Sequence, residues 1–288
     1  MMKKVLLSTA CILVLTGGAS TETFAAEAER ILTVGIVPQQ SASRLAKIWV
    51  PALNAWSDRS GYKLIFETAK DIPTFEACLA KGAYDIAYMN PYHYTVFHKQ
   101  SGYKAFARQA DKMLKGIIVA RQDADAKDLS SLDGGAVAFP SPAAFGASVI
   151  PRAELRQMGI NFTPRYVRSH DSVYRAVSAG LIPAGGGVLR TFNTVDPEIR
   201  DQLKVIYQTD GYTPHAFAAR DTLSSEAVEK VFEAMQYTNQ EGSEVLTSLG
   251  MKGIIGAVDS DWDDVRALNL AASHTDIVDD ESLQCHSD

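Results

Sequence analysis

The hydrophobic pattern of the chain alternates between that of buried strands and that of amphipathic helices. Residues 31–37 are a near-continuous apolar run that ends at Pro38, which is typical of a strand buried on both faces. The apolar residues that follow recur at helical spacing, at Leu45, Ile48, Trp49, Leu53 and Trp56. Pro51 lies within this helix, so we expect a kink or a break there.

Strand and helix signals go on alternating as far as about residue 270. Further strands are predicted at residues 63–68, 84–88, 104–108, 115–121, 136–139, 164–168 and 203–208. Further helices are predicted near residues 75–82, 92–100, 152–158, 169–177, 228–235 and 262–268. Three glycines, residues 185–187, indicate a short strand with a turn. Strands that alternate with helices predict an α/β fold with mostly parallel sheets.

The first residues have the pattern of a secretory signal peptide. Lys3 and Lys4 precede an apolar run at residues 5–15, and small residues at Thr23 and Ala25 fit cleavage after Ala25. A membrane anchor would need about 20 apolar residues, so we expect residues 1–25 to be removed on export. Residues 271–288 carry five acidic and few apolar residues, and we expect them to be a loosely ordered acidic tail.

Charge and cysteine usage narrow the function classes. Removal of residues 1–25 changes the formal net charge from −6 to −7, which argues against a nucleic-acid partner. A local basic cluster could still hold a small anion. Cys78 and Cys285 then remain, and Cys78 shares the helical face of two apolar residues, so a buried core thiol is favoured over a disulfide or a metal ligand. No metal ligands with metal-site spacing are present, and no cofactor is expected.

Polar or small residues follow several predicted strands, where helices begin. Such turns occur at residues 39–41, 141–144 and 169–172, with a less clear one at residues 90–92. Ligands of open α/β sheets bind beyond the carboxyl ends of the strands, and the free N–H groups of a helix N-terminus suit an anion. The sequence therefore predicts an anion site at these turns.

Several segments together resemble the periplasmic substrate-binding proteins of phosphate, phosphite and phosphonate ABC transporters. The resemblance covers most of residues 30–270 and is carried by residues 36–41, 87–94, 138–145, 169–174 and 211–215. It implies a type II periplasmic-binding fold of two lobes joined by two hinge strands. Residues 29–116 and 216–270 would form lobe 1 and residues 117–215 lobe 2, with crossings at residues 116–121 and 212–219.

The resemblance also implies which residues form the anion site. His170 corresponds to the family's histidine, but Ala144-Phe145-Gly146 stands where phosphonate binders have a run of hydroxyls, so backbone N–H groups, Ser141 or Ser148 would serve instead. Arg190 and His215 fall where acidic groups hold the ammonium of an aminophosphonate, which favours a simpler anion. The ligand-binding candidates are Gln40, Asn90, Tyr92, Ser141, Ala144, His170, Asp171, Arg190, Tyr212 and His215.

Several of these candidates also have an ordinary structural interpretation. Asp171 fits a helix N-cap better than a ligand contact, and Ser141 fits a turn residue equally well. Tyr92 could belong half to the core, Arg190 to the surface, and His215 to the hinge. The sequence does not decide between these alternatives.

The leading hypothesis is a monomeric periplasmic receptor that closes its cleft around a phosphorus oxyanion and docks on a membrane permease. The alternative is a sensor that presents an oxyanion to a membrane histidine kinase. An arsenic oxyanion belongs to that alternative, and arsenite would require Cys78 to face the cleft. An enzyme is not expected, because the sequence contains no GxSxG, HExxH or P-loop motif.

Overall fold

The computed structural model describes residues 30–125, 128–241, 243–270 and 285. The predicted signal peptide and nearly all of the predicted acidic tail lie outside the described residues. None of the described helices combines the length and the apolar character needed to cross a bilayer.

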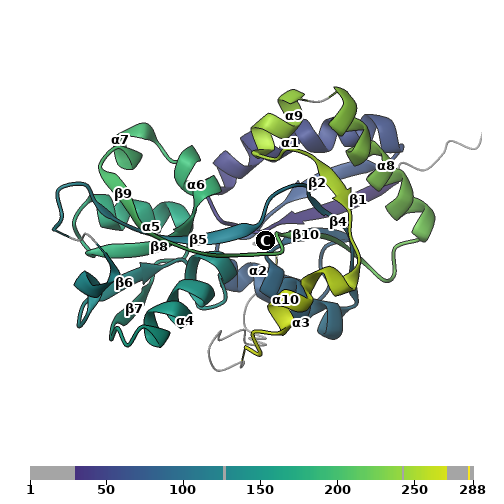
Figure 1. The fold of residues 1–288 in the computed structure, drawn as a ribbon. Coiled ribbons are helices and arrows are strands. Elements are labelled where there is room, and N and C mark those ends of the chain that lie inside the picture. The colour runs from purple at the N-terminus through teal and green to yellow at the C-terminus, as the bar shows by residue number, and fades with distance from the viewer. Residues whose placement is uncertain (1–29, 126–127, 242, 271–284, 286–288) are drawn as a thin grey trace, which may run out of the picture.

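The chain forms two β-sheets, each flanked by helices, in two lobes that lie side by side (Figure 1). The first sheet has the strand order β11 (Ile254–Gly256), β4 (Tyr103–Gln109), β10 (Ala216–Arg220), β3 (Ile86–Met89), β1 (Ile31–Ile36) and β2 (Lys63–Glu67). The second has the order β7 (Thr163–Tyr166), β6 (Ala136–Phe139), β8 (Ala184–Val188), β5 (Leu114–Arg121) and β9 (Leu203–Tyr212). The predicted two-lobed α/β fold is therefore confirmed.

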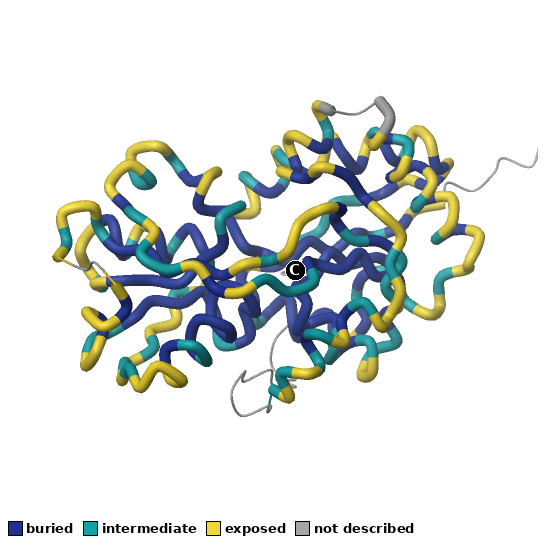
Figure 2. The backbone as a smooth tube through the Cα atoms, in the orientation of Figure 1, coloured by how far each residue is buried: buried dark blue, intermediate teal, exposed yellow. Residues whose placement is uncertain are grey.

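Helices cover both faces of each sheet. In the first lobe, α1 (Ala42–Ser60), α8 (Ser225–Glu241) and α9 (Ser243–Leu249) lie on one side, and α2 (Ile72–Ala80), α3 (Pro91–Ser101) and α10 (Asp263–Arg266) on the other (Figure 1). The second lobe has α4 (Ile150–Gln157), α5 (His170–Ser178), α6 (Leu189–Thr194) and α7 (Pro197–Arg200). The strands are largely buried while the outer helix faces are exposed (Figure 2).

The continuous apolar runs of the sequence are strands buried on both faces. In β5, Ile117 and Val119 pack with Val173 of α5, whereas Ile118 packs on the opposite face with Leu155 of α4. The first lobe has a single large core, in which Trp49 of α1 lies with its ring centroid 4.7 Å from that of Tyr88 on β3. Burial of such side chains contributes most of the favourable free energy of folding.

The sheets are mixed, so the expectation of mostly parallel sheets was wrong. Parallel pairs join β1 to β2 and β3, and β6 to β7 and β8, whereas β5 pairs antiparallel with β8 and β9. In the first sheet β10 is antiparallel to both β3 and β4. The cause is the double crossing between lobes: β5 carries the chain into the second lobe and β9 carries it out, so the two run in opposite directions.

Two local expectations also differ from the structure. Pro51 lies inside α1, which is a single helix and is not split. Its ring is on the exposed side, while buried Trp49, Leu53 and Trp56 hold the helix on the sheet on both sides of it. Residues 185–187 lie within β8 and are wholly buried, so they form a flat strand surface and no turn.

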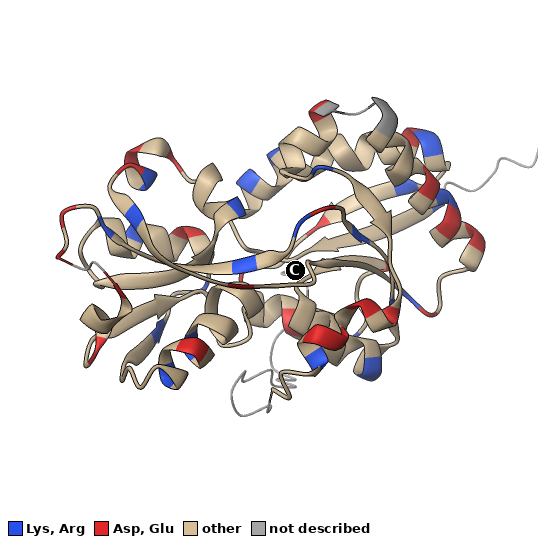
Figure 3. Ribbon diagram, viewed as in Figure 1, with Lys and Arg blue, Asp and Glu red and all other residues tan. Residues whose placement is uncertain are grey.

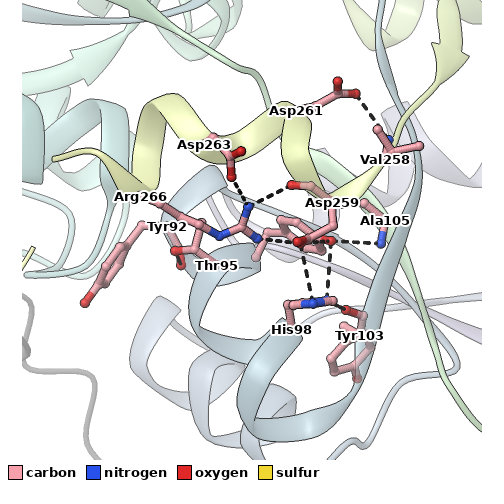
Figure 4. Close-up of polar contacts among 11 residues, drawn as sticks. Tyr92, Thr95, His98, Tyr103, Ala105, Val258, Asp259, Asp261, Asp263 and Arg266 are labelled. Atoms are coloured by element: carbon pink, nitrogen blue, oxygen red, sulfur yellow. Dashed lines mark hydrogen bonds and ion pairs between the residues drawn. The ribbon is translucent and has the colours of Figure 1, made fainter. Parts of the chain in front are cut away.

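Residues 259–266, which form the last described helical segment, bind the first lobe through a cluster of charged and hydroxyl groups (Figure 4). Asp259 accepts a hydrogen bond of 2.8 Å from the Tyr94 hydroxyl of α3 and forms an ion pair with Arg266. Arg266 also pairs with Asp263 at 2.7 Å. Cys285 packs against the same lobe's core. The helical segment also contacts the return crossing between the lobes, since the Thr213 N–H donates to Asp264 Oδ2 at 2.7 Å.

Candidate functional site

The carboxyl ends of strands from both sheets meet at a small cavity between the lobes. The cavity has a volume of about 10 Å³. From the first lobe it is lined by Val37, Gln39, Ile72 and Asn90, and from the second lobe and the return crossing by Ala144–Ala147, His170, Val188 and His215. This is the place that the strand-to-helix turns of the sequence indicated.

Asn90 links the two lobes at this cavity. It follows β3 and caps α3, since its Oδ1 accepts a hydrogen bond of 2.8 Å from the His93 N–H. Its Nδ2 donates to the carbonyl oxygen of Ala143 in the second lobe at 3.1 Å. Pro91 in the first turn of the helix needs no N–H partner, which is why Asn-Pro begins a helix well. The amide of Asn90 is therefore fixed at the lobe interface.

His170 lies at the start of α5 with its ring buried against the cavity. The N-cap of α5 is Ser169, whose Oγ accepts from the Ser172 N–H at 3.1 Å, so neither Asp171 nor Ser172 is the cap. The His170 Nδ1 lies 2.9 Å from the Thr191 hydroxyl, and its backbone N–H donates to the Gln39 carbonyl oxygen across the cleft at 3.0 Å. Burial, together with the nearby Arg190, lowers the pKa of His170 to about 3, so the ring is neutral at pH 7.

His215 is the second buried imidazole at the cavity, and it lies on the return crossing just before β10. Its ring stacks on Tyr88 with centroids 5.0 Å apart, and its Nε2 is 3.2 Å from the Nε2 of Gln39. Burial and then Arg190 lower its pKa well below the ordinary histidine value. A neutral imidazole has one donor and one acceptor nitrogen, so each histidine can donate to an anion without carrying charge.

Gln39 is a site residue that the sequence reasoning missed, because it selected the neighbouring Gln40. Gln39 lines the cavity and its Oε1 accepts a hydrogen bond from Arg190. The Gln40 amide instead donates to the Thr194 hydroxyl at 3.0 Å. Both glutamines follow β1, and only the path of the loop decides which side chain faces the cavity.

Backbone N–H groups complete the second-lobe wall, and two buried hydroxyls flank this wall in the sequence. Residues Phe145–Val149 form a turn of π-helix that continues into α4, with Ala144 as its N-cap residue. The first N–H groups of a helix have no partner within the helix. The hydroxyls of Ser141 and Ser148 are both buried without a hydrogen-bond partner in the described structure. This wall offers donors even though the hydroxyl run is replaced by Ala144-Phe145-Gly146.

Five predicted site residues, besides Gln40, lie outside the wall of the small cavity. Tyr92 is in the core of the first lobe, and Tyr212 contacts Phe145 edge to face with centroids 5.5 Å apart. Asp171 Oδ2 accepts a hydrogen bond of 3.4 Å from the Ser41 N–H across the cleft. Ser141 is buried beside the wall, and Arg190 lines a second, larger cavity of about 370 Å³.

The lobes are closed on each other in this structure. Besides the contacts of Asn90 and His170, Arg44 of the first lobe pairs with Asp196 of the second. A cavity of about 10 Å³ is near the lower limit for one water molecule. An oxyanion of several heavy atoms therefore needs the lobes to separate further before it can enter.

Comparisons with known proteins agree with this architecture. Residues 34–262 match the family model of the periplasmic substrate-binding proteins of phosphonate ABC transporters. The phosphate-import protein PhnD of Mycolicibacterium smegmatis is 23% identical, over 91% of this chain and 94% of that protein.

Two solved structures have the same fold. One is a binding-protein component of an ABC phosphonate transporter from Pseudomonas aeruginosa, with a TM-score of 0.78, 18% identity and coverage of 89% of this chain and 91% of that one. The other is PhnD1 from Prochlorococcus marinus in complex with methylphosphonate, with a TM-score of 0.74, 17% identity and coverage of 83% and 98%. The family match, which covers residues 34–262, establishes that this chain belongs to the family of periplasmic substrate-binding proteins of phosphonate ABC transporters.

Proposed function

We propose that this chain is the solute receptor of an ABC importer and binds a small phosphorus oxyanion between its lobes. The observation that carries the proposal is the convergence of Asn90, His170 and His215 with the start of the π-helix at one interlobe cavity. All of these groups can donate hydrogen bonds, and an oxyanion is the small ligand that accepts several at once. The receptor would act as a monomer, reach the periplasm by means of residues 1–25, and deliver its ligand to a membrane permease.

Binding would follow a hinge motion about the two segments between the sheets, residues 110–113 and 213–215. The anion enters the open cleft, and closure removes it from water while neutral donors surround it. The free energy lost on dehydration is offset by hydrogen bonds to a charged acceptor, which are about twice as strong as neutral ones. No residue is needed as a nucleophile or as a general base, so the function proposed is binding without catalysis.

The cavity wall favours phosphite or a simple phosphonate over phosphate. Val37, Ile72 and Val188 add apolar side chains to the cavity lining. A P–H or P–CH₃ group can face such side chains, whereas a fourth oxygen would be buried there without a hydrogen bond. An unpaired buried polar group costs about 1–3 kcal/mol, which is a factor of roughly five to 150 in affinity.

The sensor alternative differs only in the membrane partner that the closed form contacts. It would use the same cleft and the same hinge. The family assignment favours the importer.

Thermal unfolding with single ligands tests the proposal. A ligand that binds only the folded state raises the melting temperature by an amount set by its concentration relative to Kd. We expect a rise with phosphite or methylphosphonate, a smaller one with phosphate and none with sulfate. His170→Ala should abolish the rise, whereas His98→Ala, on the outer side of α3, should leave it intact. The absence of any rise with all four anions would refute the oxyanion assignment.

A further inference from the structure

A second cavity adjoins the first on the side of the hinge. Its volume is about 370 Å³, within the range of about 300–1,000 Å³ that small-molecule sites occupy. Val188 and His215 line both cavities. The Gln39 side chain, which lines the small cavity, contacts Arg190, which lines the large one. The two spaces are therefore adjacent parts of one cleft.

The larger cavity is lined by cations that have no carboxylate partner among the described residues. These are Lys112, Lys115 and Arg190, and the one acid in the same lining is Asp111. Partial burial, then the charges of Arg190 and Lys252, lower the pKa of Lys112. Arg190 and Lys252 therefore lie close enough to Lys112 for their charges to disfavour its protonated form, so the local potential is positive in a protein whose net charge is −6. Figure 3 shows basic positions on the segments that cross between the lobes.

The rest of the lining is mainly apolar. Met113 and Leu114 come from the first crossing, Leu189 from the start of α6 and Pro214 from the return crossing. The Tyr88 ring forms another wall, and the Arg190 guanidinium carbon lies 5.8 Å from its centroid. A positive site with apolar walls suits an organic group that carries negative charge. It does not suit an ammonium group, which the three cations would repel.

We propose that the larger cavity holds the organic part of the ligand and that this part bears a second anionic group, such as a carboxylate. The ligand class is then a carboxyalkyl phosphonate or a similar doubly acidic organophosphorus compound. This inference rests on the proposed function, since the phosphorus group would occupy the small cavity. When the organic part extends past His215, its anionic group replaces the Gln39 amide oxygen as the partner of Arg190.

Isothermal titration calorimetry with a short ligand series tests the inference. The series is methylphosphonate, 3-phosphonopropionate and 2-aminoethylphosphonate, which share a phosphonate but differ in the far group. We expect 3-phosphonopropionate to bind about tenfold or more tighter than methylphosphonate, since it adds a charge-assisted contact. The aminoethyl compound should bind more weakly than methylphosphonate. Higher salt should reduce the advantage of the carboxylate.

A double variant tests whether the lysines of the larger cavity cause the tighter binding of 3-phosphonopropionate. In Lys112→Met/Lys115→Met the ratio of the methylphosphonate Kd to the phosphonopropionate Kd should fall several-fold towards one. Lys104→Met, at the far end of β4, removes a similar exposed charge outside the cavity and should keep the wild-type ratio. Melting temperatures of the variants check that each is folded.

The outcomes separate the two proposals. If methylphosphonate binds and 3-phosphonopropionate binds equally or more weakly, the second anionic site is wrong while the oxyanion receptor stands. A ratio unchanged by the double variant would likewise overturn the assignment to these lysines. If no compound binds, the proposed function itself fails, and this inference with it.

Discussion

At the residue scale, the cleft contains two histidines that are buried in the neutral form. His170 has a folded-state pKa of about 3 and that of His215 is also strongly lowered, whereas an unfolded histidine titrates near 6.5. Below pH 6.5 the unfolded state therefore binds protons that the folded state does not. The stability that the two neutral histidines contribute is fully present above pH 6.5. It is lost as the pH falls towards their folded-state pKa values.

We predict that His170 costs about 2 kcal/mol of unfolding free energy between pH 7.5 and pH 5.0. Urea unfolding at the two pH values measures the loss directly. In His170→Gln the loss should be about 2 kcal/mol smaller than in the wild type, whatever the absolute stability of the variant. An identical loss in both proteins would mean that His170 is protonated in the folded state.

The burial of Cys78 answers a question that the sequence left open, namely whether its thiol could bind arsenite in the cleft. The thiol lies in the core of the first lobe with no exposed area, and burial, followed by the nearby Cys285 thiol, raises its pKa to about 12. A thiol with such a pKa provides almost no thiolate at neutral pH. The arsenite alternative required this residue to face the cleft, and it does not line either cavity.

We predict that Cys78 is inert in the folded protein. In a chain that lacks residues 1–25 and carries Cys285→Ser, Ellman's reagent should label no thiol at pH 8 without denaturant and one thiol in urea. Arsenite should leave the melting temperature unchanged. Rapid labelling of the folded protein would show that the thiol is accessible and would reopen the metalloid alternative.

The sequence predicted the kinds of residue at the site better than their identities. Asn90, Ala144 and His170 line the small cavity as expected, because they belong to strand-to-helix turns, which residue types reveal. His215 also lines it, and that expectation came from the family resemblance. Gln39 could not be separated from Gln40, since both follow the same strand. The larger cavity could not be predicted, because it joins residues from the two crossings with others more than 70 positions apart.

At the element scale, one glycine of β8 and one of β5 let the π-helix lie directly on the second sheet. A Cβ placed on Gly186 would lie 2.0 Å from the carbonyl oxygen of Ala147, which belongs to the cavity wall. Gly116 on β5 is equally close, with the Gly146 carbonyl 2.1 Å from the position of its Cβ. Backbone cannot move aside as a flexible side chain can, so these glycines set the position of the donor wall.

Gly186→Ala should therefore displace the π-helix from the sheet. We expect a loss of about 1–3 kcal/mol in stability from overpacking and a weaker affinity for the oxyanion. Chemical denaturation and calorimetry measure the two effects. Gly253→Ala is the matched control, because its Cβ would lie at an ordinary contact distance of 3.4 Å from Ala110. If Gly186→Ala binds as the wild type does, the π-helix does not supply the donors.

Helices and strands could be predicted from the sequence where their apolar residues recur at regular spacing. β5 and α5 agree with the expected strand and helix because both bury regular apolar patterns. The direction of strand pairing was not predictable, since it depends on which strands carry the chain between lobes. Pro51 does not break α1, because buried tryptophans hold the helix on the sheet on both sides of it.

At the scale of the whole molecule, function depends on the balance between open and closed lobes. Arg44 at the start of α1 pairs with Asp196, which precedes α7 in the other lobe, and the same carboxylate accepts from Arg175 of α5 at 3.1 Å. Figure 1 places the start of α1 beside α6. One arginine therefore joins the lobes, while the other binds the same acid within one lobe.

This shared acceptor permits a controlled test of closure. The Arg44 and Asp196 side chains are 26% and 46% exposed, so water screens the ion pair and it favours closure only weakly. Arg44→Gln should therefore shift the ligand-free protein towards the open form and weaken oxyanion binding by up to about fivefold.

Small-angle X-ray scattering should then show a larger radius of gyration for ligand-free Arg44→Gln than for the wild type, and saturating ligand should remove the difference. Arg175→Gln loses a bond to the same carboxylate but leaves the lobes joined, so its radius and its Kd should equal those of the wild type. If both variants change alike, the effect comes from the charge of Asp196 and not from the link between lobes. If neither changes, closure is governed by the contacts at Asn90 and His170, which lie at the ligand itself.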